Sequence, residues 1–321
     1  MVTLITGASG FLGGAVARAL PEVLATGRDP ARCAALAAEL GQPVLVLDLA
    51  TGDIDALIAA ARAAGVRRIV HAAAMTAPWG RLSDFHRSNV QATKAVLRVA
   101  AALRVERMVH VSTPSVYFRF ADQHRVPETA PLPPPVNAYA ATKAQAEALA
   151  RAAGAVILRP RGIYGPGDRA LLPRLRRAMA QGPLPLLRDG KAATDLTYVG
   201  DVAAAVTAAL AVPGIGGRVY NISGGQALAL RDVVSAVAER AGLMPQWRRL
   251  PLAPAMLAAR TIEALAHLRG REPRVTRYGL GLFAYTQTLD ISKAAADLGW
   301  SPQTGFADGL ARVFEGAAEW S

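Results

Sequence analysis

A short β-branched run followed at once by a glycine-rich turn stands at the start of the chain. Val2–Thr6 is predicted to be a strand, and the turn T-G-A-S-G-F-L-G over residues 6–13 opens a helix that runs to about residue 20. Glycines at this spacing let the backbone turn sharply and approach a pyrophosphate, while amides at the helix N-terminus bind the phosphates. A plain tight turn is the alternative, but the position between strand and helix favours a dinucleotide site. The residues expected at the phosphates are Gly7, Ser9, Gly10, Phe11, Leu12 and Gly13.

Five further β-branched runs alternate with Ala-rich helical stretches over the first half of the chain. Strands are expected at residues 22–26, 43–48, 68–73, 107–113 and 155–160, with helices near 31–40, 53–64, 85–103 and 137–153. This alternation predicts the α/β class with a doubly wound parallel sheet (Rossmann), which binds ligands at the carboxyl ends of its strands.

The prolines and glycines after residue 161 interrupt the alternation of strands and helices and predict a smaller C-terminal substrate lobe. Residues 1–160 form the expected dinucleotide-binding domain, and 195–222 return to it through a segment at 196–199 and a helix over 202–210. Residues 161–194 and 223–321 form the expected substrate lobe, and 120–136, with four prolines in its last six residues, is expected to be a loop.

Composition narrows the class of protein. The chain has 321 residues, 52% of them hydrophobic, yet no apolar run approaches the roughly 18 residues that span a bilayer. A lone cysteine, Cys33, fits a reducing compartment, so a cytoplasmic protein with no secretory signal and no membrane span is expected. The net charge of +12 comes mostly from scattered arginines, which favours a solvated basic surface over a nucleic-acid interface and would also attract an anionic cofactor.

The end of the second predicted strand is expected to select between the two nicotinamide dinucleotides. An acidic residue there usually binds the ribose hydroxyls of NAD, whereas a nearby Arg suits the 2′-phosphate of NADP. The strand ends in Ala-Thr-Gly, and Arg28 follows immediately. The sequence therefore favours NADP(H) over NAD(H), with Asp29 as the ribose contact in the NAD(H) alternative. At the end of the third strand, Asp48 and Leu49 are expected to contact the adenine, unless Asp48 is a helix N-cap.

Tyr139 and Lys143 are four residues apart in an Ala-rich stretch that is predicted to be helical. Four residues make about one helical turn, so the phenol and the ammonium group project from the same face. The ammonium group favours the phenolate and is expected to lower the pKa of Tyr139 towards the working pH. Tyr139 thereby becomes a candidate proton donor or acceptor for a carbonyl or alcohol oxygen. An exposed pair on a surface helix is the alternative.

A hydroxyl-rich turn, S-T-P-S-V-Y over residues 112–117, follows the predicted strand at 107–113. In a doubly wound sheet this turn lies at the carboxyl end of a strand, where the reactive ring of the cofactor is expected. A Thr or Ser hydroxyl at this point can hydrogen-bond the reacting oxygen and help to polarise it. A turn that merely ends the strand is the alternative.

The glycine turn, the S-T-P-S-V-Y turn and the Y-x-x-x-K pair, in this order, resemble the extended short-chain dehydrogenase/reductase superfamily. Further matches span nearly the whole chain: H-A-A-A at 71–74, N-V-x-x-T at 89–93, L-R-P at 158–160, Y-G-P-G at 164–167, Y-V-x-D at 198–201 and L-D-I at 289–291. The resemblance implies that Tyr139 is the acid/base and that Lys143 holds the nicotinamide ribose and tunes the phenol. It makes Thr113 the hydrogen-bond donor to the carbonyl, with Ser115 in reserve.

The same resemblance adds two residues to the expected site and leaves the oligomeric state open. Asn89 matches an Asn near the nicotinamide end, and Ala72 lies in the motif that follows the fourth strand, beside the cofactor. A homodimer formed by pairing two helices per subunit is common in this superfamily. No metal is part of the expected site.

Two branches of the superfamily compete. Sugar-nucleotide epimerases and dehydratases carry an Arg before the Y-V-x-D motif, and this Arg clamps the substrate diphosphate. Thr194 stands there in this chain, so the best anchor for a diphosphate is lost unless Arg188 or Arg231 substitutes. The S-T-P-S-V turn and the G-P-G-D segment at 165–168 are instead similar to 3β-hydroxysteroid dehydrogenases and bacterial β-keto acid reductases. An apolar helix near 253–268 is expected either to cover a lipophilic cleft or to form the core of the small lobe.

The sequence thus predicts an NAD(P)-dependent oxidoreductase that moves hydride between nicotinamide and a secondary alcohol or ketone of an apolar small-molecule substrate. A sugar-nucleotide epimerase or dehydratase is the first alternative. A non-catalytic dinucleotide-binding sensor is the second, although such a protein has no need of the Thr/Tyr/Lys set.

Overall fold

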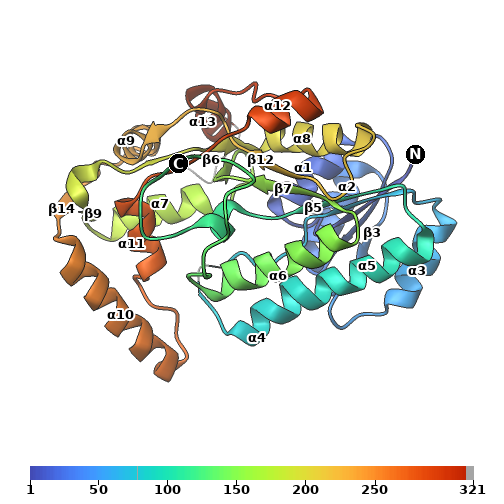
Figure 1. Ribbon diagram of the computed structural model, residues 1–321, viewed down its shortest axis with the longest axis horizontal. Coiled ribbons are helices and arrows are strands. Elements are labelled where there is room, and N and C mark those ends of the chain that lie inside the picture. Colours follow the sequence, from blue (N-terminus) through green and yellow to red (C-terminus); the bar gives the residue numbers. More distant parts are fainter. Residues whose placement is uncertain (78, 316–321) are drawn as a thin grey trace.

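A seven-stranded parallel sheet forms the centre of the molecule in the computed structural model, which describes residues 1–77 and 79–315 (Figure 1). Pro78 and residues 316–321, the end of the predicted substrate lobe, lie outside the described residues. The strand order is β12-β7-β5-β4-β1-β2-β3. The strands are β1 Thr3–Thr6, β2 Val23–Gly27, β3 Val44–Val46, β4 Arg68–His71, β5 Arg107–Val111, β7 Val156–Pro160 and β12 Val219–Ile222. The predicted α/β class and doubly wound Rossmann sheet are confirmed.

Helices cover both faces of this sheet (Figure 1). One face packs against α1 (Phe11–Ala19), α2 (Pro30–Leu40) and α8 (Val199–Ala211), and the other against α3 (Ile54–Ala63), α5 (Ala92–Leu103) and α6 (Ala138–Ala152). The strands read as continuous apolar runs because both of their faces are buried. All six strands predicted from these runs are present, with ends that differ by a few residues.

The return of the chain to the main sheet differs from the prediction. Residues 196–199 do not join it: β11 (Thr197–Tyr198) pairs with β8 (Ile163–Tyr164) in a separate two-stranded sheet. The seventh strand of the large sheet is β12, a buried run beyond α8 that pairs with β7. The predicted helix over 85–103 is also interrupted, since α4 (Leu82–Phe85) passes into a π-helical turn, η1 (His86–Gln91), before α5 begins.

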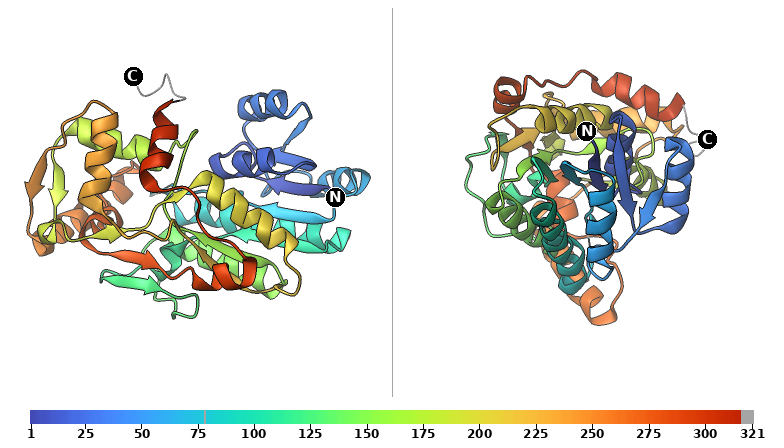
Figure 2. Two further views of the ribbon diagram at one scale, coloured as in Figure 1. Left: turned by 90° about the horizontal axis from the view of Figure 1, so that it is seen from above. Right: turned by 90° about the vertical axis from the view of Figure 1, so that its right-hand side faces the viewer.

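A second set of elements lies beside the carboxyl edge of the large sheet (Figure 2). Its four-stranded sheet has the order β13-β10-β15-β6, and β14 pairs with β9. The prediction of a loop over 120–136 is wrong in part, because β6 within it pairs with β15, more than 150 residues away in sequence. The division of the chain into two domains stays a prediction. The strands are β6 Gln123–Val126, β9 Leu184–Leu186, β10 Ala193–Thr194, β13 Leu228–Ala229, β14 Trp247–Arg249 and β15 Gln287–Leu289, and the helices are α7 Leu171–Gln181, α9 Leu230–Arg240, α10 Leu252–Arg269, α11 Arg277–Ala284, α12 Ser292–Leu298 and α13 Phe306–Glu315.

The apolar helix predicted near 253–268 is α10, which projects from the lower left of Figure 1. It is not a fully buried core helix: one face, with Ala259, packs onto the lobe, while Leu257 and Leu268 are 66% and 85% exposed. None of the helices in the described ranges is long and apolar enough to cross a membrane.

Candidate active site

The glycine turn between β1 and α1 is held too closely for other side chains. Gly7 has a φ of +73°, and a Cβ atom there would lie 2.7 Å from the Cα of Ala73, in the segment after β4. A Cβ atom at Gly13 would lie 2.2 Å from the carbonyl oxygen of Gly7. Any larger residue would therefore push α1 away from the turn. The backbone of this segment can approach a bulky anion closely, as the sequence predicts.

No side chain in the described part of the protein caps the first turn of α1. Gly10 is its N-cap and supplies no side-chain acceptor, and the turn holds no acidic residue. The helices α2 and α3, in contrast, are capped by the carboxylates of Asp29 and Asp53. Unpaired amides at a helix N-terminus form a positive, hydrogen-bonding end that suits a pyrophosphate. The amides of Phe11, Leu12 and Gly13 thus fit a dinucleotide cofactor.

The residues at the end of β2 differ in whether their side chains are available to contact the ribose of a dinucleotide. Arg28 is exposed and makes no hydrogen bond or ion pair with the described part of the chain. Asp29 is already engaged, since its carboxylate accepts the amide of Arg32 and forms an ion pair with that side chain at 3.3 Å. The Ser9 hydroxyl faces the end of β2 rather than the helix axis, because a Cβ atom at Gly27 would lie 2.3 Å from it. This arrangement leaves a guanidinium, not a carboxylate, available at the strand end.

The residues predicted at the adenine lie at the end of β3 and β4. Asp48 is exposed and accepts the amide of Ala50 at 2.9 Å, so it closes a turn and is not a helix N-cap; Asp53 has that role for α3. Leu49 buries its side chain in the core, which leaves only its backbone for a ligand, and a cavity of about 340 Å³ opens beside it. Ala72 follows β4 and donates its amide to the carbonyl of Thr6.

Hydroxyl groups from three distant segments meet at the carboxyl end of β5. The Thr113 hydroxyl donates to Ser115 Oγ at 3.1 Å and lies near the phenol of Tyr139, on α6, whose pKa it acts to lower. Ser115 Oγ in turn lies 2.9 Å from the phenolic oxygen of Tyr278, on α11. Thr113 and Ser115 are buried, at 7% exposure each. The structure therefore brings together the predicted Thr113 and Tyr139 and adds a tyrosine that the sequence did not indicate.

The protonation state of Tyr139 differs from the prediction. Burial raises the pKa of the phenol from 10.0 to about 12, and the interaction with Thr113 only partly opposes this effect. The expected lowering of the pKa by Lys143 is wrong for this structure, because Lys143 Nζ donates to the carbonyl of Val111 at 2.6 Å instead of reaching towards the phenol. A phenol in this state keeps its proton at neutral pH and suits proton donation.

Lys143 is buried beneath the site at 2% exposure. Desolvation lowers its pKa from 10.5 to about 8, although Glu147, one turn further along α6, raises it. Glu147 is held by Arg159 of β7 through a buried ion pair and accepts the Ser112 hydroxyl at 2.5 Å. One stripe of α6 thus carries a phenol, an ammonium group and a carboxylate at successive turns, and the carboxylate fixes the strand ends beside it.

Asn89, predicted near the nicotinamide end of the cofactor, is held by hydrogen bonds to two other segments of the chain. It is 1% exposed and lies in the π-helical turn η1. Its side chain accepts the amide of Met75 at 2.7 Å and donates to Thr142 Oγ1 at 3.0 Å. Asn89 therefore ties the segment after β4 to α6, between Tyr139 and Lys143. Contact with a nicotinamide stays a prediction for this residue.

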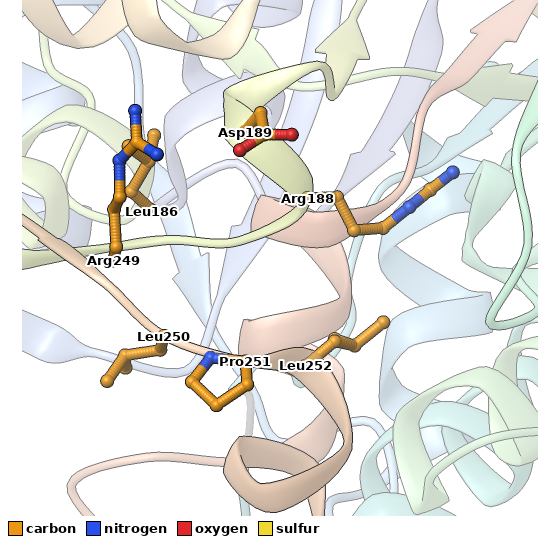
Figure 3. Close-up of a pocket in the computed structure, with 7 residues that line it drawn as sticks. All are labelled: Leu186, Arg188, Asp189, Arg249, Leu250, Pro251 and Leu252. Carbon is orange, nitrogen blue, oxygen red and sulfur yellow. The ribbon is translucent and has the colours of Figure 1, made fainter.

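The two arginines that the sequence offers as substitutes for the diphosphate clamp have other partners. Arg188 pairs with Asp122 at 2.7 Å and stacks on the ring of Tyr285. Arg231 lies over the ring of Trp247 at 6.0 Å. Figure 3 shows that Arg188 extends away from Asp189. Both residues line a cavity of about 360 Å³, and none of the predicted catalytic residues is among its lining residues. Its lining residues are Leu186, Arg188, Asp189, Arg249, Leu250, Pro251 and Leu252.

Three side chains at the site were missed from the sequence. Glu147 extends the four-residue spacing of Tyr139 and Lys143, and this spacing was a signal that could have found it. Tyr278 and Arg161 had no such signal, because their neighbours come from segments far away in sequence.

Comparison with known proteins adds independent findings. The family model described as the NAD dependent epimerase/dehydratase family matches residues 3–223. The chain is 34% identical to 2-alkyl-3-oxoalkanoate reductase of Stenotrophomonas maltophilia, over 98% of each chain. It is 33% identical to 4-hydroxy-2-methyl-3-oxo-4-farnesyl-3,4-dihydroquinoline-1-oxide ketoreductase of Stigmatella aurantiaca, over 97% of this chain and 95% of that protein.

Among solved structures, the fold is similar to that of DesIV, a dTDP-glucose 4,6-dehydratase from Streptomyces venezuelae with NAD and TYD bound. The TM-score is 0.77 at 28% sequence identity, and the match covers 98% of this chain and 96% of the other.

Proposed function

The chain belongs to the NAD dependent epimerase/dehydratase family, and we propose that it is an NADP(H)-dependent reductase of an apolar β-keto acid or a similar ketone. The observation that carries this proposal is that the Thr113 hydroxyl lies beside the Tyr139 phenol at the carboxyl end of β5. It lies on the same edge of the sheet as the uncapped N-terminus of α1, where a dinucleotide fits.

The residues of the chain have separate tasks in the reduction. A nicotinamide cofactor, when bound, would supply the hydride that the carbonyl carbon receives. The Thr113 hydroxyl donates a hydrogen bond to the carbonyl oxygen and polarises it, and the Tyr139 phenol transfers its proton to the same oxygen. The net change is one hydride and one proton added across the C=O bond, which gives a secondary alcohol. The pKa of Tyr139 is raised to about 12, so at neutral pH the phenol holds the proton that the reduction requires.

An apolar keto substrate is supported over a sugar nucleotide. The names of the two relatives describe reductases of an alkyl-substituted oxo acid and of a farnesyl-bearing oxo compound. Thr194 lacks the charge to clamp a diphosphate, and Arg188 and Arg231 are engaged elsewhere. The likeness to a dTDP-glucose dehydratase keeps sugar-nucleotide chemistry as the second candidate.

An absorbance assay at the nicotinamide band tests this proposal directly. The full-length protein is given NADPH or NADH with 3-oxo acids, methyl ketones and the 4-keto form of a sugar nucleotide. We expect consumption of NADPH with the oxo acids and ketones. Turnover with the sugar nucleotide alone would replace the proposal by its second candidate, and cofactor binding without any turnover would favour a sensor.

The preference for NADP(H) rests on the exposed and unpaired Arg28 at the end of β2. Replacing Arg28 with Ala should raise the Kd of NADPH by about 10- to 100-fold, the range of a charge-assisted contact, and that of NADH by no more than about twofold. Fluorescence titration with both cofactors measures this. Arg32→Ala is the matched control, because Arg32 already pairs with Asp29. Equal losses for the two cofactors in the Arg28 variant would remove its role at the 2′-phosphate.

A cytoplasmic location, a homodimer and the two-domain division stay predictions. The buried thiol of Cys33 is compatible with a reducing compartment.

A further inference from the structure

We propose that Arg161 is a binding site for the carboxylate of the substrate, so that this enzyme is built for ketones that carry an acid group. The inference rests on the proposed reductase function and names the part of the substrate that lies beyond the reacting carbonyl.

Arg161 is a buried cation without an ion-pair partner in the described part of the chain. It follows β7 directly and is 8% exposed. Its guanidinium donates to two neutral groups, Gln287 Oε1 and, at 3.1 Å, Thr194 Oγ1. Its Nε is buried and has no hydrogen-bond acceptor among the described residues.

Arg159, two residues earlier, has a carboxylate partner of the kind that Arg161 lacks among the described residues. Arg159 is equally buried, and the carboxylate of Glu147 neutralises it through hydrogen bonds from Nε and Nη2. Asp195, whose charge acts to raise the pKa of Arg161, uses its carboxylate to accept the amide of Leu289 at 2.7 Å. A buried charge that is not paired costs several kcal/mol, so an unpaired guanidinium at a ligand-binding edge indicates that an anion completes it.

The position of Arg161 fits the substrate side of the site. It stands at the carboxyl end of β7, the neighbour of β5, whose end carries Thr113. The phenol of Tyr278, on α11, lies 2.9 Å from Ser115 Oγ. Gln287, which accepts from Arg161, is in β15, the strand that follows α11 in the chain.

The contact between Arg161 and Thr194 bears on which kind of anion the Arg161 guanidinium can bind. In the sugar-nucleotide branch of the superfamily, from which this chain departs here, an Arg at this position holds a diphosphate. Here the position is Thr194, and a guanidinium reaches it from Arg161 at the edge of the large sheet. A guanidinium at this edge of the sheet suits a small anion that is part of the reacting molecule, such as a carboxylate. The planar set of N–H groups of the guanidinium can bind both carboxylate oxygens.

The test compares an acid with its neutral ester. Wild-type and Arg161→Gln proteins are assayed with NADPH and either 3-oxodecanoate or methyl 3-oxodecanoate, which share the same carbonyl and chain. We expect the ratio of kcat/KM for acid over ester to fall by about 10- to 100-fold in Arg161→Gln and to be partly restored in Arg161→Lys, which keeps the charge but loses the fork. Decanoate, which cannot react, should raise the melting temperature of the wild type and not that of Arg161→Gln.

Arg249→Gln is the control for net charge, since Arg249 is exposed and lines the separate cavity of Figure 3. An unchanged acid-to-ester ratio in Arg161→Gln, with normal folding by circular dichroism, would overturn the carboxylate site while leaving the reductase intact. Equal losses in Arg161→Gln and Arg249→Gln would also overturn it, because they would reflect net charge alone. Failure of the wild type to reduce either compound would instead count against the proposed function.

Discussion

Replacing Tyr139 with Phe is expected to lower kcat for ketone reduction by about 10²- to 10⁴-fold, the range that a positioned general acid supplies. The change removes the phenolic proton and little else, because a Phe ring keeps the packing against Phe85, whose centre lies 6.3 Å away. Binding of NADPH should change by no more than about threefold, since the glycine turn and α1 are untouched. Steady-state assays at saturating NADPH and a fluorescence titration of the cofactor measure the two quantities.

Tyr198→Phe is a suitable control for the Tyr139 variant, because the Tyr198 hydroxyl makes no hydrogen bond within the described ranges and its ring contacts Tyr164 and Arg312. Its kcat should stay within about twofold of wild type. A Tyr139→Phe protein that keeps more than a tenth of the activity would exclude the phenol as the main proton donor. A loss of NADPH affinity as large as the loss of kcat would instead make Tyr139 a cofactor ligand.

The large sheet could be predicted because its signals are local. Each strand buried on both faces is a continuous apolar run, and the glycine turn marks the first crossover. The family resemblance drawn from these motifs is confirmed by the match over residues 3–223. Strands of two to four residues that pair only with distant segments, such as β6 with β15, carry no comparable signal. They were missed because partners far away in sequence decide their conformation.

Part of the candidate site could also be predicted from the sequence. Tyr139 and Lys143 share one helical face, and Thr113 ends a predicted strand, so their meeting follows from the topology of a doubly wound sheet. The pKa values of Tyr139 and Lys143 could not be predicted in the same way, because spacing in the sequence does not show how deeply a side chain is buried. Desolvation, which outweighs the neighbouring charges, raises the pKa of Tyr139 and lowers that of Lys143. Tyr278 reaches the site from α11 and could not be placed without the fold.

Replacing Lys143 with Met is expected to stabilise the cofactor-free protein while removing most of its activity. Folding lowers the pKa of Lys143 from 10.5 to about 8, so the charged form is disfavoured in the folded state. The full cost, at most about 3 kcal/mol, applies below pH 8, where the lysine is charged both folded and unfolded. As the pH rises from about 8 towards 10.5, the folded protein loses this proton first and the cost disappears. After the lost hydrogen bond to Val111 is subtracted, Lys143→Met should gain about 1–3 kcal/mol at pH 7 and almost nothing near pH 10.5.

Urea denaturation at pH 7, 9 and 10.5 measures the stability of Lys143→Met, and NADPH-dependent reduction at pH 7 measures the functional cost. We expect kcat/KM to fall by at least about 100-fold, because the ammonium group is the proposed ribose holder and also fixes α6 to the end of β5. Lys191→Met, at an exposed position before β10, is the matched control and should change neither quantity by much. A Lys143→Met protein that is less stable than wild type at pH 7 would mean that the bond to Val111 outweighs desolvation. A buried charge that lowers stability is expected to persist only where function requires it. A Lys143→Met protein that is more stable and fully active would therefore show that the buried ammonium group has no role in the reaction.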